Sequence, residues 1–132
     1  MTSSPRPGGT SDVPPALGWT VLALVFLDEL LLVAAVWFAA AQAAGWVAGV
    51  VAGLAVVAVW WSFASPKAPW GGGGVRPVVK VLVVAAACGG LWATGHVVTA
   101  AALLVFSVVV NALAMLPSVA RLPGEAGTGA VR

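Results

Sequence analysis

The stretch Val25-Phe26-Leu27-Asp28-Glu29-Leu30-Leu31-Leu32 places two adjacent carboxylates inside a long apolar segment. An apolar run of about 20 residues is typical of a membrane-spanning helix, and acidic side chains within such a helix are costly unless protein groups accommodate them. The stretch therefore predicts a transmembrane helix with a polar site, formed by Asp28 and Glu29, near the middle of the span.

The composition of the whole chain points to the same class of protein. Of its 132 residues, 61% are hydrophobic and 8% are charged, whereas roughly 25% are charged in soluble domains. A single soluble domain of this length could not bury so much apolar surface, so the lipid bilayer is the expected partner. The six Lys and Arg residues form no basic stripe, and nucleic acid is not an expected partner.

Proline, glycine and charged residues divide the chain into four predicted helices, at about 18–41, 45–64, 77–94 and 96–116. The break before the last helix is placed at Gly95, because glycine can adopt the positive φ of a tight turn. The predicted fold class is all-α, a four-helix transmembrane bundle over residues 17–117. The flanking Ser-, Pro- and Gly-rich tails, 1–16 and 118–132, are expected to be disordered and cytosolic.

The positions of the cations predict the orientation of the bundle. Four crossings place both termini on one side, and the segments of that side carry every cation: Arg6, Lys67, Arg76, Lys80, Arg121 and Arg132. The positive-inside rule therefore predicts cytoplasmic N- and C-termini. The seven tryptophans fall toward the ends of the predicted helices, where amphipathic rings form aromatic belts.

Glycines predict where the helices pack. Gly45, Gly49 and Gly53 share one face of the second helix, and Gly89 and Gly90 each follow an alanine four residues earlier in the third. Small residues at this spacing let transmembrane helices approach closely. These contacts are expected within the bundle, with a seam between two copies of the chain as the alternative.

Asn111 and Ser107 are the expected neighbours of the two acids. A helical side chain leans toward the N-terminus of its own helix, so Asn111 in the fourth helix points into the membrane, toward the carboxylates of the first. The same rule directs Lys80 toward the cytosolic end of the third helix, well short of Asp28. The candidate intramembrane polar or ion site is therefore Asp28, Glu29, Asn111 and Ser107.

The remaining reactive residues predict neither an enzyme nor a cofactor. His96 is the sole histidine and has no second metal ligand beside it, so no metal site is expected. His96 lies about two to three helical turns from Cys88 and from Ser107 in depth, so it is not expected to act as the general base for either side chain as a nucleophile. The glycines at 71–74 lack the Gly-Lys-Ser/Thr ending of a phosphate-binding loop.

Two motifs are distinctive: Phe26-Leu27-Asp28-Glu29-Leu30, and Trp61-Ser62-Phe63-Ala64-Ser65-Pro66-Lys67-Ala68-Pro69. They resemble the Phe-x-x-Glu-Leu and Trp-x-x-Phe-x-x-Pro-Lys-Ala-Pro motifs of the YrdB-like family of small bacterial four-span membrane proteins of unknown function. The resemblance covers about residues 18–116 and implies a four-helix fold in the bacterial inner membrane. Val25 and Lys80 stand where the family tends to carry Arg and Glu.

Two functions are compatible with these features. The first is a structural or interaction role, in which the chain packs with itself or with a larger membrane partner through its glycine faces. The second is a small proton- or cation-coupled transporter or channel subunit that uses Glu29 and Asp28. In the first case, the acids would serve as a polar clamp between the first and fourth helices.

Overall fold

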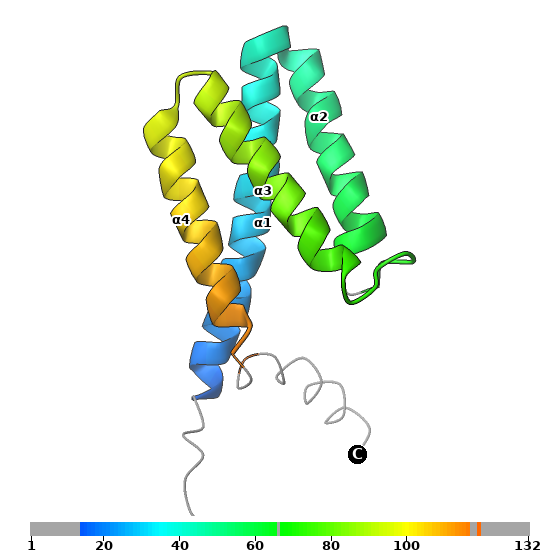
Figure 1. The fold of residues 1–132 in the computed structure, drawn as a ribbon, viewed down its shortest axis with the longest axis vertical. Coiled ribbons are helices and arrows are strands. Elements are labelled where there is room, and N and C mark those ends of the chain that lie inside the picture. The colour runs from blue at the N-terminus through cyan, green and yellow to red at the C-terminus, as the bar shows by residue number, and fades with distance from the viewer. Residues whose placement is uncertain (1–13, 66, 117–118, 120–132) are drawn as a thin grey trace, which may run out of the picture.

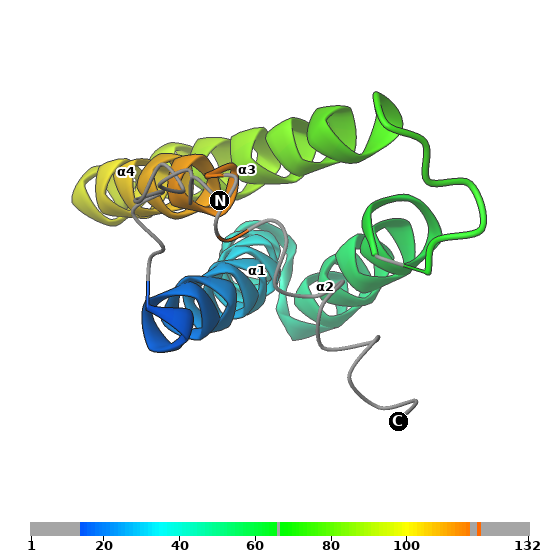
Figure 2. The same ribbon diagram turned by 90° about the horizontal axis from the view of Figure 1, so that it is seen from below.

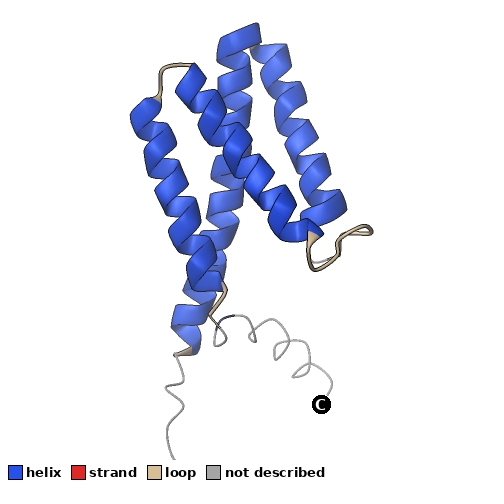
Figure 3. Ribbon diagram, viewed as in Figure 1, coloured by secondary structure: helices blue, strands red, loops and turns tan. Residues whose placement is uncertain are grey.

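The computed structural model describes residues 14–65, 67–116 and 119, which contain helices and no strand (Figure 3). The elements are α1 (Pro15–Ala44), α2 (Trp46–Val59), the π-helix η1 (Trp60–Ala64), α3 (Val75–Ala93) and α4 (Val97–Ala114). Within the described residues, four spans are long and apolar enough to cross a membrane, α2 and η1 forming one of them. The predicted all-α, four-helix fold is confirmed, and it is the fold of a multi-pass membrane protein.

α1 is longer than predicted at both of its ends. It begins at Pro15 rather than Gly18 and ends at Ala44 rather than Ala41. Proline is well suited to the first turn, because the backbone N–H that it lacks would have no helical partner there. Glycine at position 45 then stops the helix, since it adopts a φ of 90°.

The other boundaries lie close to those predicted. α3 begins at Val75, so that Pro77 lies in its first turn, and α4 ends at Ala114, before the predicted limit. A proline is tolerated in a first turn for the reason that applies to α1. The two predicted tails, 1–16 and 118–132, lie outside the described residues except for the few that begin α1 and for Val119.

α1 is the central helix of the bundle, in contact with α2, α3 and α4. In Figure 1, α2 and α4 lie on opposite sides of α1, and α3 crosses in front of it at an angle. Viewed from below in Figure 2, α1 and α2 form one layer while α3 and α4 form a second layer against it. The buried core between the layers is made of Leu32, Ala35, Ala87, Leu91, Ala100 and Leu103.

The two ends of the bundle differ. At one end, Gly45 (φ 90°) joins α1 to α2 and Gly95 (φ 86°) joins α3 to α4. Both glycines adopt a backbone conformation that other residues rarely adopt. We call this the turn end; the opposite end, with the start of α1 and the 65–74 loop, is the loop end (Figure 1).

α1 projects beyond the other helices at the loop end (Figure 1). A Cβ added to Gly90 of α3 would meet Ala39 of α1, and Lys80 of α3 pairs with Glu29 of α1. The same number of residues separates the two members of each pair, so α1 and α3 run in the same direction with the same offset at both contacts. That offset places Val75, the first residue of α3, level with Leu24 rather than with the start of α1.

Three of the predicted packing glycines lie in helix contacts. A Cβ added to Gly49 would lie 2.8 Å from Cβ of Ala41, and one added to Gly90 would lie 2.8 Å from Cβ of Ala39. Gly53 is also buried on the face of α2 that meets α1. These glycines therefore let α2 and α3 approach α1 closely, as their spacing predicted.

Gly45 and Gly89 have different roles from the packing role predicted for them. Gly45 forms the turn after α1, and nothing lies within 4 Å of a Cβ added there or at Gly89. Adjacent helical residues point about 100° apart, so Gly89 faces away from α1 when Gly90 faces it. Gly89 thus lies on an exposed face of α3, uncovered within a single chain.

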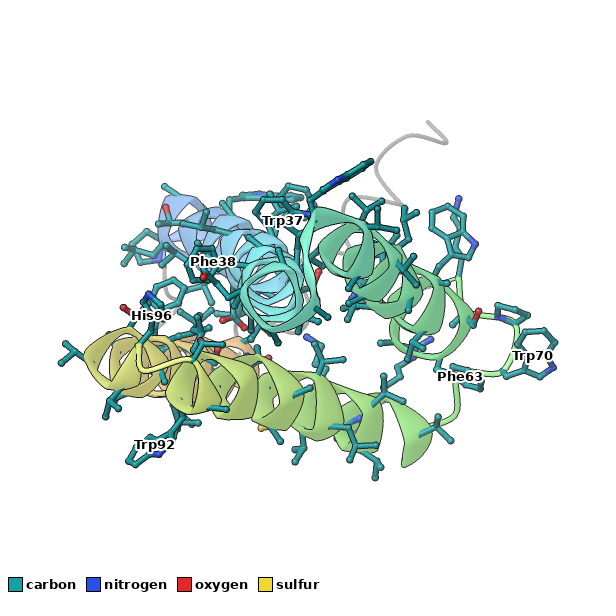
Figure 4. All side chains as sticks on the ribbon, turned by 90° about the horizontal axis from the view of Figure 1, so that it is seen from above. Trp37, Phe38, Phe63, Trp70, Trp92 and His96 are labelled. Carbon is teal, nitrogen blue, oxygen red and sulfur yellow. The ribbon has the colours of Figure 1, made fainter. Side chains whose placement is uncertain are left out.

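Exposed tryptophans lie near both ends of the bundle. Trp46 and Trp92 are exposed toward the turn end, and Trp61 and Trp70 are exposed at the loop end. Seen from above, Trp92 points away from the bundle, and Trp70 lies beside Phe63 at the opposite edge (Figure 4). This arrangement suits rings that sit at the two surfaces of a bilayer.

Candidate intramembrane polar site

Asp28 is the buried centre of the polar site, with 2% of its surface exposed. The Ser107 hydroxyl donates a hydrogen bond to Oδ1 at 2.5 Å, and Asn111 Nδ2 donates to Oδ2 at 3.0 Å. The two donors are four residues apart on α4, so they share the face that meets α1. The structure places Asn111 and Ser107, the two neighbours expected from the sequence, beside Asp28.

Asn111 connects Asp28 to Lys80. Its Nδ2 donates to Asp28 and to the Ser107 carbonyl, at 3.0 and 2.8 Å, and its Oδ1 accepts a hydrogen bond from Lys80 Nζ at 3.3 Å. This orientation of the amide is the one that places the donor against the carboxylate and the acceptor against the ammonium. A single neutral side chain therefore links α4 to both α1 and α3.

Lys80 and Glu29 form an ion pair, with 3.2 Å between Nζ and Oε1. Lys80 was expected to stop well short of Asp28, and its contacts are with Asn111 and Glu29; the pairing with Glu29 was not predicted. The reason is the offset of α3, whose start lies level with Leu24, so that Lys80 begins at the depth of the acids and needs little reach. The site therefore contains five side chains from three helices: Asp28, Glu29, Lys80, Ser107 and Asn111.

The site lies closer to the loop end than to the middle of the bundle. Lys80 is the sixth residue of α3, and Asn111 is three residues before the end of α4. At about 1.5 Å per residue, the cluster lies roughly 5–8 Å from the loop ends of these two helices. A central position was predicted because the depth of the acids was counted from the start of the first helix. That helix, α1, projects beyond the others, so the count made the site appear deeper than it is (Figure 1).

Asp28 has no cationic partner among the described residues. With both carboxylates ionised and Lys80 protonated, the five side chains carry a formal charge of −1. Lys80 contacts Glu29, whereas the two groups that contact Asp28 are the neutral Ser107 and Asn111. Hydrogen bonds to a carboxylate partly replace its hydration, but they add no compensating charge.

A cavity of about 170 Å³ reaches this cluster between α1, α2, η1 and α3. Asp28, Glu29, Lys80 and Asn111 lie on its wall, and the rest of the lining is apolar. Glu29 and Lys80 keep 20% and 35% of their side-chain surfaces exposed. The cavity thus joins a polar wall that carries an ion pair to a larger apolar surface.

Trp60 forms part of the apolar wall and belongs to the π-helix η1. The Ser65 N–H donates to the Trp60 carbonyl at 2.9 Å, the wider hydrogen-bonded turn of a π-helix. The indole Nε1 is buried and has no hydrogen-bond partner among the described residues. π-Turns are frequent at functional sites, and this one brings both Trp60 and Ala64 to the cavity.

Sequence reasoning missed Lys80 and Trp60 as members of the site. The sequence did contain a signal for Lys80. An ammonium about one turn inside a predicted span needs an acidic partner, and the only acidic residues within the predicted spans are Asp28 and Glu29. Trp60 had none, since no residue pattern announces a π-turn.

His96, the other residue considered for chemistry, lies apart from the polar site at the turn end. It precedes α4, and its ring meets Phe38 edge-on with 5.0 Å between the ring centroids (Figure 4). Its Nδ1 lies 3.3 Å from the Thr94 hydroxyl. The contact with Phe38 packs the turn at Gly95, between α3 and α4, against α1.

No known protein family, curated protein or solved structure matches this chain. The geometry of the polar site and of the helix surfaces is therefore the basis for any functional proposal.

Proposed function

We propose that this chain is a multi-pass protein of the bacterial inner membrane, related to the YrdB-like family, with both termini in the cytoplasm. Within the described residues, the cations Lys67, Arg76 and Lys80 belong to the loop end, and the turns at Gly45 and Gly95 contain no Lys or Arg. The positive-inside rule assigns such a cation-rich end to the cytoplasm.

The function proposed in that membrane is a structural or interaction role. Asp28 and Glu29 are held by partners from α3 and α4, so the polar site has the form of a clamp between three helices. Buried polar networks with complete hydrogen bonding hold a structure in one arrangement. The clamp supports a rigid scaffold, which suits a protein that presents a surface to a partner.

The exposed small-residue face of α3 is the observation that carries the interaction role. Ala85, Gly89 and Ala93 follow one another at intervals of four residues, and all three are exposed. A Cβ added to Gly89 would meet nothing within 4 Å. Such a face lets a second transmembrane helix approach closely, and the partner to test first is a second copy of the chain.

The test introduces a large side chain on this face. Gly89→Ile is expected to abolish self-association, measured as energy transfer between differently labelled copies in vesicles as lipid is added. Ala58→Ile, at an exposed position of α2, is the matched control and should associate like the wild type. A wild-type chain that shows no energy transfer, or an unaffected Gly89→Ile variant, would contradict association through α3.

Proton- or cation-coupled transport is the second candidate function, and the cavity favours it. Because the cavity reaches Glu29 and Lys80, the Glu29 carboxylate is accessible from outside the packed helices. Proton-coupled flux should be compared in vesicles containing the wild type, Glu29→Gln or Asp28→Asn. Flux that is lost while folding is retained supports transport. A wild type without flux, whose variants are merely less stable, supports the clamp.

A further inference from the structure

We propose that the cavity between α1, α2, η1 and α3 binds a small organic monocation: a quaternary ammonium attached to an apolar group about the size of benzene. The proposal concerns binding and does not depend on the scaffold role. It rests on the volume of the cavity, the apolar character of its wall and the unbalanced charge of the cluster at its polar side.

The volume sets the size of the apolar group. The cavity measures about 170 Å³, and an apolar cavity of about 150 Å³ in another protein stays dry and binds benzene. Phe26, Val57 and Val83 are among the apolar residues of the wall, so an aromatic or branched hydrocarbon would find the surface it needs.

The charge of the cluster selects a cation. Lys80 pairs with Glu29, whereas the hydrogen-bond donors of Asp28 are neutral. With both carboxylates ionised, one formal negative charge therefore remains at the polar side of the cavity. An unbalanced charge is costly in a low-dielectric environment, and a bound cation would neutralise it. An anionic ligand would add to the excess negative charge.

The type of cation follows from the hydrogen bonds and from Trp60. Both oxygens of Asp28 and one oxygen of Glu29 already accept hydrogen bonds or an ion pair from protein donors. A quaternary ammonium has no N–H and needs none of these acceptors, because its attraction is purely electrostatic. Trp60 contributes to the wall the aromatic side chain that attracts such ions most strongly.

The surroundings of the cavity give the ligand a way in. Phe26, Leu30 and Val57 line it and remain 59%, 51% and 44% exposed, so the wall continues onto the outer surface of α1 and α2. Within the membrane, that surface faces the acyl chains. An amphipathic cation dissolved in the bilayer would therefore reach the site from the side.

The experiment compares two ligands that differ only in charge. Benzyltrimethylammonium and its neutral carbon isostere, neopentylbenzene, are titrated calorimetrically into the full-length protein in lipid nanodiscs, with empty nanodiscs as the blank. The cation is expected to bind saturably and at least about tenfold more tightly than the isostere, a difference of about 1.4 kcal/mol. Equal affinities, or no binding of the cation to the folded wild type, would overturn the proposal.

Charge variants test the sign of the effect in both directions. Glu29→Gln brings the cluster to a formal charge of 0 and should weaken cation binding, whereas Lys80→Met brings it to −2 and should strengthen it. Each change is expected to be about tenfold, with the isostere unaffected. Unchanged affinity in both variants would contradict the role of the cluster.

Two further variants test the location of the site. Val57→Phe fills the cavity and should abolish binding of both ligands, whereas Val105→Phe, at an exposed position on α4 outside this cavity, should bind the cation like the wild type. This pair decides the location even if Lys80→Met fails to fold. Gly89→Ile should also retain cation binding, so a failed association test leaves this inference standing.

Discussion

Asn111 and Asp28 are joined across the bundle by a hydrogen bond of 3.0 Å from Nδ2 to Oδ2. Asp28 is almost completely buried, so removing this donor leaves Oδ2 without its protein hydrogen bond. The other end of the same amide accepts a hydrogen bond from Lys80. Loss of Asn111 would therefore disturb the contacts of α4 with both α1 and α3.

Asn111→Leu is expected to destabilise the protein by about 1–3 kcal/mol, because it leaves a buried carboxylate oxygen without its donor. The measurement is the free energy of unfolding in mixed detergent micelles. Ala112→Leu, the exposed neighbour on α4, is the control and should change that free energy by less than about 0.5 kcal/mol. Equal losses of stability in the two variants would show that the hydrogen bond from Asn111 to Asp28 does not contribute to stability.

The Glu29–Lys80 pair should reveal itself in a double-mutant cycle. Glu29→Gln and Lys80→Met each leave a charged partner behind, whereas the double variant removes both charges, so its loss of stability should be smaller than the sum of the two. The expected coupling is about 0.5–1 kcal/mol, a modest value because about a third of the Lys80 side chain is exposed. Additive losses would mean that the pair contributes nothing.

Gly49 and Gly89 should respond oppositely to alanine. At Gly49 the new Cβ would lie 2.8 Å from the Trp37 carbonyl oxygen, so the backbones of α1 and α2 must separate, at a cost of about 1–3 kcal/mol. At Gly89 the Cβ meets nothing within 4 Å, and the higher helix propensity of alanine should stabilise α3 by up to about 1 kcal/mol. Thermal unfolding of the two variants measures these changes in stability. If both substitutions stabilised the protein, or both destabilised it, the prediction would be wrong.

Gly45→Ala should destabilise the turn between α1 and α2, because its φ of 90° is unfavourable for any residue with a Cβ. The expected loss is about 1–3 kcal/mol, the cost of a strained backbone conformation. Gly73→Ala is the matched control, since Gly73 lies in the loop, lacks a positive φ and has no atom near its added Cβ. A Gly45→Ala variant as stable as this control would contradict the conformational requirement.

Cysteine labelling should establish the orientation of the bundle. In a Cys88→Ser background, Ala43→Cys at the turn end should react with a membrane-impermeant maleimide in intact cells. Gly73→Cys at the loop end should react only after the membrane is opened. This result follows from the cation-rich loop end lying in the cytoplasm, and the reverse pattern of labelling would contradict it.

The fold was predictable because its main determinant is local. Long apolar runs interrupted by Pro66, Gly95 and charged residues predict the number and approximate bounds of the helices without reference to tertiary contacts. The contact of Asn111 with Asp28 was predictable for a related reason, since side-chain lean and antiparallel direction depend only on the helices themselves.

The register between helices was not predictable from the sequence. Nothing in the residues of α1 marks Leu24 as the position level with the start of α3, so both the depth of the acids and the reach of Lys80 were misjudged. The choice between Gly89 and Gly90 as the packing residue depends on the rotation of α3, another tertiary quantity. The π-turn at Trp60 and the cavity beside it depend on the same relationships.

The unequal helix lengths have a mechanical consequence. α1 has 30 residues and the other spans have 18 or 19, so one rod of about 45 Å stands among three of about 27–29 Å. The three short rods match a hydrocarbon slab of about 30 Å, which leaves the first turns of α1 among the lipid headgroups. Leu17 and Trp19 are exposed on this projecting start of α1 and anchor it in the interfacial layer. The anchor keeps the polar site at a constant depth below the lipid phosphates.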